Sequence, residues 1–306
     1  MYHRFNEPEH PSTNISTQRF EEQMNFLAVE GFTVLPLSDL VLFFEKKKNL
    51  PDKTVFITID DAYKSIFTEA YPVLKKYGFP FSVFTSTDFV SEDENSSFMT
   101  WKMLNYLSKN NVEILNHTSS HKNLLDLSSK EIRENIVEAE ILIEEKIGKK
   151  PEILSYPYGE SSENVEKIVD KLNYKIAFSQ HSSPIHLNEN VLRLPRFAIN
   201  DSYGSLERFK QIVNSKPLLL ENLSLLDSIS NKNSTTLKFK SNKNSKKINC
   251  FINNNATLKK NNIKSDKIVI NLSGFIEKQR YRLNCTFFSE RKELFWFGKM
   301  IIYRKN

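Results

Sequence analysis

Residues 55–65 read VFITIDDAYKS, a β-prone run that ends in two adjacent carboxylates, Asp60 and Asp61. Neighbouring carboxylates repel each other, so a strand that ends in such a pair needs a compensating partner. On either side, from residue 1 to about 212, short apolar runs alternate with amphipathic helix patterns. This alternation is typical of βαβ units and a parallel sheet, and it predicts that chemistry lies at the carboxyl ends of the strands.

Six or more strand–helix units in about 210 residues predict a closed or nearly closed α/β barrel, with an open doubly wound sheet as the alternative. Within this part, we expect strands over 53–59 and 191–199, a helix capped by Ser38, and a capping box from Ser128 to Glu131. After about residue 215, β-rich runs separated by Asn, Ser, Lys and Gly predict a small all-β sandwich. We expect a linker over 214–223 and domains over 1–214 and 215–306.

Composition describes an ordinary globular chain of 306 residues, with 39% hydrophobic and 26% charged residues. The sequence holds no apolar run near the length that spans a bilayer. Its net charge is +6, from 43 basic and 37 acidic residues, which indicates a Lys-rich solvated surface or attraction to a polyanion such as a cell-wall polymer. Basic residues interleaved with aromatics are not evident, so we expect no nucleic-acid partner.

The two cysteines, Cys250 and Cys285, lie 35 positions apart in segments that read as strands. They are either reduced core thiols or one disulfide across the sandwich, and a disulfide would imply an oxidising, extracytoplasmic compartment. The chain opens MYHRF, without the basic and apolar regions of a signal peptide. Because MYHRF looks like the end of a first strand, we hypothesise that Met1 is internal to a longer natural protein whose upstream part holds an export signal.

Polar residues follow two further strands. The strand VEILN is followed by His117, with His121 four residues later, and EILSY is followed by Pro157–Gly159. Histidines at i and i+4 share one face of a helical turn and can bind one metal, although two ordinary loop histidines would give the same spacing. A carboxylate from a neighbouring strand end would complete a site with open positions, as catalytic metals have. One aspartate could then be a ligand while the other stays free as a base.

The segments TIDDAY, NHTSSH and SYPYGE, in this order and spacing, resemble the three leading motifs of the polysaccharide deacetylases, the nodulation-protein-B homology domain of carbohydrate esterase family 4. The resemblance covers roughly residues 1–212 and implies a distorted (β/α) barrel. INCF and YRLNCT, ahead of LFWFG, resemble the small β-domain that some members carry. The resemblance of the three barrel motifs further implies a metal-dependent hydrolase that removes N-acetyl groups from amino-sugar polymers or oligomers, such as chitooligosaccharides, cell-wall glycans or exopolysaccharides.

By this resemblance, Asp60 corresponds to the base that takes a proton from the attacking water. Asp61, His117 and His121 correspond to the metal ligands, which usually hold zinc. Thr118 corresponds to a hydroxyl residue that orients the histidine loop. The resemblance thus distributes the two adjacent acids between two different tasks.

The third motif implies that Pro157 and Tyr158 form a turn at the substrate, where the Tyr158 backbone N–H contributes to the oxyanion hole. In the family this motif usually begins with an arginine that holds the base carboxylate, and here that position is Ser155. Arg196, in the later segment LPRF, is our candidate for the missing arginine. A surface or salt-bridged role for Arg196 is the alternative.

The family's late Leu-x-x-His motif, which supplies the general acid, is not clear in this chain. His181, which ends a strand, is the first candidate for the acid; His186, further along the loop, is the second. His3, which ends the first strand, is a third candidate and also a candidate for substrate binding. Ordinary polar loop positions are the alternative for all three.

Two other functions fit the same motifs: a glycan-binding barrel that has lost turnover, and a related metal amide hydrolase that acts on a lipid-linked sugar. For the C-terminal domain, the aromatics, such as Trp296, either bind glycan or fill the core of a structural cap. The sequence does not distinguish which sugar polymer is used, nor the oligomeric state.

Overall fold

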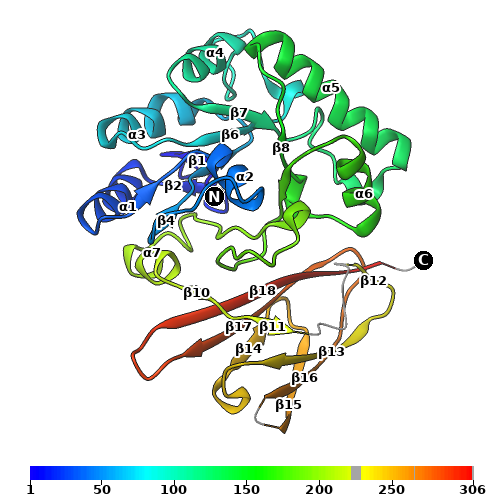
Figure 1. Ribbon diagram of the computed structural model, residues 1–306. Helices are drawn as coiled ribbons and strands as arrows, with labels where there is room; N and C mark the ends of the chain where they lie inside the picture. Colours follow the sequence, from blue (N-terminus) through cyan, green and yellow to red (C-terminus); the bar gives the residue numbers. More distant parts are fainter. Residues whose placement is uncertain (222–228, 265, 305–306) are drawn as a thin grey trace.

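The computed structural model describes residues 1–221, 229–264 and 266–304. Figure 1 shows a helix-rich unit built on a curved parallel sheet, and below it a unit made of two packed sheets. The predicted α/β barrel followed by an all-β unit is therefore confirmed. Among the described residues, no helix combines the length and apolar character needed to cross a membrane.

A five-stranded parallel sheet, in the order β5-β6-β7-β8-β9, is the frame of the first unit. Its strands are β5 (Thr58–Asp60), β6 (Ser82–Thr85), β7 (Glu113–Asn116), β8 (Ile153–Ser155) and β9 (Ile176–Phe178). All five strands are buried at nearly every position, as expected for a parallel sheet covered on both faces. Because all five strands run parallel, their carboxyl ends lie at one rim of the sheet, and the residues that follow each strand are brought together there.

The two edges of this sheet are joined by the chain's first residues. Tyr2 bridges Ile59 in parallel, and Leu194 bridges Phe178 at the other edge. Met1 closes the gap, since its nitrogen donates to the Phe197 carbonyl at 3.0 Å and its carbonyl accepts from Ile199. The sheet is thus a distorted closed barrel, and the open doubly wound alternative does not form.

Two strands expected in the barrel are shorter than predicted. The run 53–59 is divided, because β4 (Thr54–Val55) pairs outside the barrel with β3 (Thr33–Val34), and β5 is the part that belongs to the barrel sheet. The run 191–199 forms a 3-10 turn at Val191–Arg193 and a single bridge. Pro195 follows that bridge and has no N–H to extend a ladder.

Helices cover the outside of the barrel (Figure 1). The helical elements of the barrel unit are α1 (Thr17–Val29), α2 (Leu37–Phe44), η1 (Ile66–Ala70), α3 (Tyr71–Tyr77), η2 (Thr87–Phe89), α4 (Trp101–Lys109), η3 (Leu124–Asp126), α5 (Ser129–Ile147), η4 (Pro157–Gly159), α6 (Glu163–Lys171), η5 (Val191–Arg193) and α7 (Leu206–Val213). The capping box of Ser128 and Glu131 forms as predicted. The predicted Ser38 cap is wrong: α2 begins at Leu37, and the Glu113 carboxylate accepts the first N–H groups, from Leu37 and Ser38.

The second unit is a two-sheet sandwich. One sheet has the order β10-β18-β17-β14 with β12 also on β18, and the other β11-β13-β16-β15. Its elements are β10 (Lys216–Pro217), β11 (Leu220–Glu221), β12 (Ile229–Ser230), β13 (Ser234–Ser241), η6 (Ser245–Lys247), β14 (Asn249–Ile252), β15 (Thr257–Lys264), β16 (Lys267–Ser273), β17 (Arg280–Phe288) and β18 (Leu294–Tyr303). β16 and β17 alternate buried and less buried residues, so each presents one face to the shared core.

The cysteine pair joins neighbouring strands rather than the two sheets. Cys250 on β14 lies in register with Cys285 on β17, and their sulfur atoms are bonded at 2.03 Å. The prediction that the disulfide would join the two sheets is therefore wrong, because the bond lies within one sheet.

Trp296 lies outside the sandwich core. Its ring packs edge-on against Phe197 of the barrel, with 5.3 Å between the ring centroids. This contact belongs to the interface between the two units.

We propose the domain boundary at residues 214/215, between α7 and β10. The linker expected over 214–223 is wrong in its described part, because residues 216–217 and 220–221 form β10 and β11 and pair with β18 and β13. Its last two residues, 222 and 223, lie outside the described residues.

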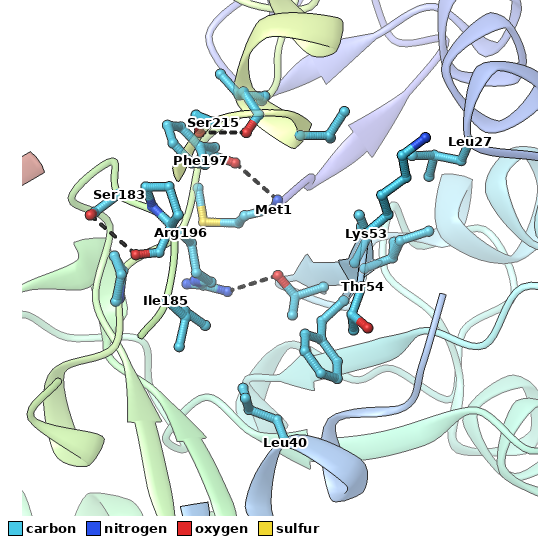
Figure 2. A pocket seen from close by; sticks show the side chains of 18 of the residues that line it. Met1, Leu27, Leu40, Lys53, Thr54, Ser183, Ile185, Arg196, Phe197 and Ser215 are labelled. Atoms are coloured by element: carbon cyan, nitrogen blue, oxygen red, sulfur yellow. Dashed lines mark hydrogen bonds between the residues drawn. The ribbon is translucent and has the colours of Figure 1, made fainter. Parts of the chain in front are cut away.

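A cavity of about 530 Å³ lies at the amino end of β5 (Figure 2). Apolar side chains such as Leu27, Leu40 and Ile185 line much of it, together with Met1 and Arg196. Neither carboxylate of the Asp60–Asp61 pair lines this cavity, so it is distinct from the rim where the strand ends collect polar residues.

Candidate active site

A sharp turn after β5 brings both carboxylates of the Asp60–Asp61 pair to one place. In a continuing strand, adjacent side chains would point to opposite faces. Here Asp61 and Ala62 have φ values of 75° and 56°, which end the alternation. Backbone hydrogen bonds hold the turn, from Asp61 N to Phe84 O and from Met99 N to Ala62 O, both at 2.9 Å. Left-handed conformations are unfavourable for residues other than glycine, so this geometry depends on its surroundings.

The histidine loop after β7 also uses left-handed residues. Thr118 has φ 69° and His121 φ 54°, so the helical turn that we expected to carry His117 and His121 is wrong. The loop is held by the Asn116 side chain, which accepts from Thr118 N at 2.7 Å, and by the Thr118 hydroxyl, which accepts from His121 N at 3.2 Å. The two imidazole rings nevertheless lie together, with centroids 4.9 Å apart.

Asp61 lies against both histidines. Its Oδ1 is 3.4 Å from Nε2 of His117 and 3.3 Å from Nε2 of His121. The three side chains form a group whose ligand atoms all lie within 4.8 Å of one another. Asp61 Oδ1 is buried and has no hydrogen-bond partner among the described residues. An unsatisfied buried carboxylate oxygen facing two imidazole nitrogens is a suitable environment for a cation.

The tautomer of His117 strengthens this fit. Its Nδ1 is 2.7 Å from the Ser155 carbonyl oxygen, which can only accept, so Nδ1 carries a hydrogen. In the neutral ring, the lone pair of Nε2 then faces the Asp61 carboxylate, and two acceptors cannot satisfy each other. A metal ion or a second proton must lie between them. A nitrogen ligand whose other ring N–H donates to a backbone carbonyl is the usual arrangement in metal sites.

The pKa values of Asp61 and His117 are shifted in the directions that favour a positive charge between the two side chains. Burial disfavours ionisation of Asp61, but the contact with His117 and the charges of the nearby histidines outweigh it and lower the pKa of Asp61. Burial also acts against charge on His117, yet Asp61 and Asp60 raise the pKa of His117 above its ordinary value. His121 responds in the opposite direction, because burial and the charge of His117 lower its pKa to about 4.

Asp60 is fully buried and is held by Arg196. The guanidinium donates from Nη1 to Oδ1 at 2.7 Å and from Nη2 to Oδ2 at 2.8 Å, which is the bidentate pairing that arginine makes with carboxylates. Burial opposes ionisation of Asp60, but the charge of Arg196 overcomes it, and the pKa of Asp60 is lowered. Sequence reasoning named Arg196 as a candidate for this contact, and the structure brings the two side chains together.

Ser155 explains how an arginine from a distant segment reaches Asp60. Its hydroxyl accepts from Arg196 Nη2 at 2.7 Å and lies 3.4 Å from Asp60 Oδ2. The remaining donors of Arg196 go to the Ser179 carbonyl and the Thr58 hydroxyl, so the guanidinium makes five hydrogen bonds. The small Ser155 side chain thus occupies the family's arginine position while leaving room for Arg196. Figure 2 shows the Arg196 side chain in the wall of the cavity, with a dashed line marking one of its hydrogen bonds.

The Pro157–Gly159 turn borders the metal-ligand group. Pro157 is buried, whereas Tyr158 is 40% exposed and its ring lies 4.8 Å from that of His121. Within the turn, Gly159 N donates to Tyr156 O and Glu160 N to Pro157 O, so both later N–H groups are engaged. Of the residues that we predicted to contact substrate in this turn, Tyr158 is the one with an open surface.

The three candidate acids occupy different surroundings. Tyr2 O accepts from Asp60 N at 2.9 Å, which puts His3 at the same strand end as Asp60. Burial lowers the pKa of His3, while the charges of Asp61 and Asp60 oppose that change. His186 pairs with Glu189 at 3.1 Å in its own loop.

The charges that act on His181 come from Lys299 and Arg193, not from the two aspartates. Burial lowers the pKa of His181 to about 3. The structure therefore does not bring our first candidate for the acid to the carboxylates, whereas both aspartates act on His3.

Sequence reasoning missed Arg280. This residue begins β17 of the sandwich, yet its Nη1 donates to the Tyr158 carbonyl at 3.1 Å. Nothing in the surrounding sequence, IEKQRYRLN, marks one arginine as a neighbour of a turn 122 residues earlier.

Comparisons with known proteins agree with this arrangement. Residues 47–177 match the family model described as polysaccharide deacetylase. The poly-beta-1,6-N-acetyl-D-glucosamine N-deacetylase of Staphylococcus aureus is 28% identical over 199 residues, which cover 61% of this chain and 68% of that protein.

Two solved structures share the fold. The deacetylase PplD of Streptococcus pyogenes, in complex with acetate, has a TM-score of 0.64 at 21% identity and covers 70% of this chain and 96% of its own. IcaB from Ammonifex degensii has a TM-score of 0.59 at 21% identity, covering 69% of this chain and 94% of its own. Both matches show likeness of fold over the barrel-sized part of the chain.

Proposed function

Because the barrel of this chain belongs to the polysaccharide deacetylase family, we propose that it hydrolyses N-acetyl groups of amino-sugar polymers or oligomers. This makes the chain a hydrolase of non-peptide carbon–nitrogen bonds. The observation that supports the proposal most is the division of the two acids. Asp61 faces two imidazoles, whereas Asp60 is paired with Arg196 and lies beside the same group.

Asp61, His117 and His121 would hold a divalent metal, and two nitrogen ligands with one oxygen ligand favour zinc. When bound, the metal supplies positive charge that polarises the acetamide carbonyl and lowers the pKa of water. Asp60 takes the proton of the attacking water, for which it must be ionised, and Arg196 keeps its pKa low. The water oxygen bonds to the carbonyl carbon, and the Tyr158 N–H is our proposed donor to the oxyanion.

His3 is the proposed general acid. It delivers a proton to the sugar nitrogen as the carbon–nitrogen bond breaks, which releases acetate and a free amino sugar. Its place at the strand end of Asp60 supports this role better than the surroundings of His181 or His186 do.

Poly-β-1,6-linked N-acetylglucosamine is the first substrate that we propose, because the Staphylococcus aureus relative is named as an N-deacetylase of this polymer. We also propose that the chain works outside the cytoplasm, where such polymers are modified. The Cys250–Cys285 disulfide supports that location, since structural disulfides persist in oxidising compartments.

Acetate release tests the proposal. The full chain is freed of metal with a chelator, reloaded with zinc or cobalt, and incubated with β-1,6-linked N-acetylglucosamine oligomers, chitin oligomers, peptidoglycan fragments and a lipid-linked N-acetylated sugar. We expect release with metal and none without it, together with about one bound ion per chain. Glycan binding with no release would support the binding-only barrel, and release only from the lipid-linked sugar would support the related amide hydrolase.

A further inference from the structure

One side chain of the β-sandwich, Arg280, contacts the Tyr158 turn of the proposed active site. Besides its hydrogen bond to the Tyr158 carbonyl, its Nε lies 3.3 Å from Oε1 of Glu160. Its guanidinium carbon is 5.7 Å from the centre of the Tyr158 ring. The three contacts converge on two residues of the turn that borders the metal-ligand group.

The turn needs such support because its backbone is unfavourable. Tyr158 has φ 61° and ψ 2°, a left-handed conformation that costs a residue with a side chain roughly 1–2 kcal/mol. On the barrel side, Gly159 is wedged against Gln180, so closely that an added Cβ would lie 2.4 Å from the Gln180 side chain. The Ser179 hydroxyl donates to the Gly159 carbonyl. Arg280 adds a contact to this turn from the second unit.

Glu160 extends the link to the histidine loop. Its side chain is nearly fully buried, at 4% exposure, which raises the pKa of Glu160. Asn123, two residues after His121, donates to Oε2 at 2.6 Å, while Arg280 faces Oε1. The carboxylate therefore connects the histidine loop, the Tyr158 turn and the sandwich. Removal of Arg280 would leave a buried acid with one partner fewer.

We propose that Arg280 is a positioning residue for the deacetylase site, so that turnover depends on the β-sandwich; this inference rests on the proposed function. By holding the carbonyl of Tyr158, the guanidinium restricts rotation of the residue whose N–H is proposed to face the oxyanion. Catalysis is sensitive to such small displacements of a donor. The sandwich is thus a working part of the enzyme rather than only a cap.

Kinetics of the full-length, metal-loaded chain test the inference. Arg280→Ala is compared with Lys278→Ala, which removes a neighbouring cation that lies 3.7 Å from Asp126 and does not touch the turn. Removing an oxyanion donor outright costs 10²–10³ in kcat, so loosening one should cost about tenfold. We expect Arg280→Ala to lower kcat about tenfold with KM within about twofold, Arg280→Lys to recover part of it, and Lys278→Ala to match the wild type. A rise in KM alone would mean that Arg280 binds glycan, and would overturn the positioning role.

Hydrogen exchange gives a readout that does not require activity. In Arg280→Ala, amides of residues 156–161 should exchange about tenfold faster than in wild type or Lys278→Ala, with Arg280→Lys between them. Unchanged exchange would overturn the inference, whatever the kinetics. If wild type releases no acetate from any glycan, the proposed function fails, while the exchange rates still decide whether Arg280 holds the turn. Should Arg280→Ala not fold, Arg280→Lys against Lys278→Ala makes the same comparison.

Discussion

Replacing Arg196 by methionine should destabilise the barrel and change how activity depends on pH. Methionine fills much of the same volume but donates no hydrogen bond. The carboxylate of Asp60, which is 0% exposed, would keep the Ser155 hydroxyl at 3.4 Å and the more distant His117 Nε2 at 4.0 Å. Breaking a buried ion pair by removing one partner costs about 3–5 kcal/mol, because the remaining charge stays buried without compensation. We expect a loss of this size at neutral pH in the metal-free protein.

The pH dependence has a definite sign. Arg196 lowers the pKa of Asp60 in the folded state, so the pair contributes stability above the unfolded-state pKa of aspartate, about 3.9, and loses it as pH falls through the folded pKa. In Arg196→Met, burial is opposed by His117 and His3 without the guanidinium, so the pKa of Asp60 rises. The variant should therefore differ least from wild type in acid, where Asp60 is protonated. Because the base must be ionised, the acid limb of kcat/KM should move to higher pH.

Urea unfolding followed by the helical circular dichroism signal measures this loss, since all α-helices of the described residues precede residue 214. A double-mutant cycle with Asp60→Asn should give a coupling of about 2 kcal/mol or more. Additivity within about 0.5 kcal/mol would refute the reasoning. Arg193→Met is the matched control: Arg193 pairs with the buried Glu166 elsewhere in the barrel, so its loss should lower stability without moving the pH profile.

Three further outcomes are expected. Asp60→Asn should abolish acetate release while zinc content stays at the wild-type level; loss of zinc would mean that the two acids have the reverse roles. His3→Gln should lower kcat by about 10²–10⁴, as loss of a general acid does, and unchanged kcat would remove His3 from the mechanism. Replacing Cys250 and Cys285 by serine should cost the sandwich about 4 kcal/mol for a loop of 35 residues, measured by thermal unfolding, and a change below about 0.5 kcal/mol would show that the disulfide does not form.

The adjacent acids and the two histidines could be located from sequence because each follows a short apolar strand. In a parallel barrel, the ends of such strands meet at one rim, so order along the chain was sufficient to predict their neighbourhood. Their local backbone was not predictable. The turn at Asp61 and the loop at Thr118 adopt left-handed conformations without glycine, and only the surrounding contacts make these tolerable.

Short-range signals for helices were reliable where a cap and its partner are close in sequence, as at Ser128 and Glu131. The signal at Ser38 failed because a residue far along the chain, Glu113, caps that helix from a neighbouring strand. The same limit applies to the cysteines: their spacing allowed a bridge, but the register of β14 and β17 determined which strands it joins.

By itself, the sequence determined the fold class and the group of Asp60, Asp61, His117 and His121, since hydrophobic periodicity and strand order are properties of short segments. Only the tertiary structure decided which cations support that group. Arg196 reaches Asp60 across 136 residues, and Arg280 reaches Tyr158 across 122. A guanidinium can pair with any carboxylate or carbonyl that the folded chain brings within about 3 Å, so its partner is a property of packing and not of its neighbours in sequence.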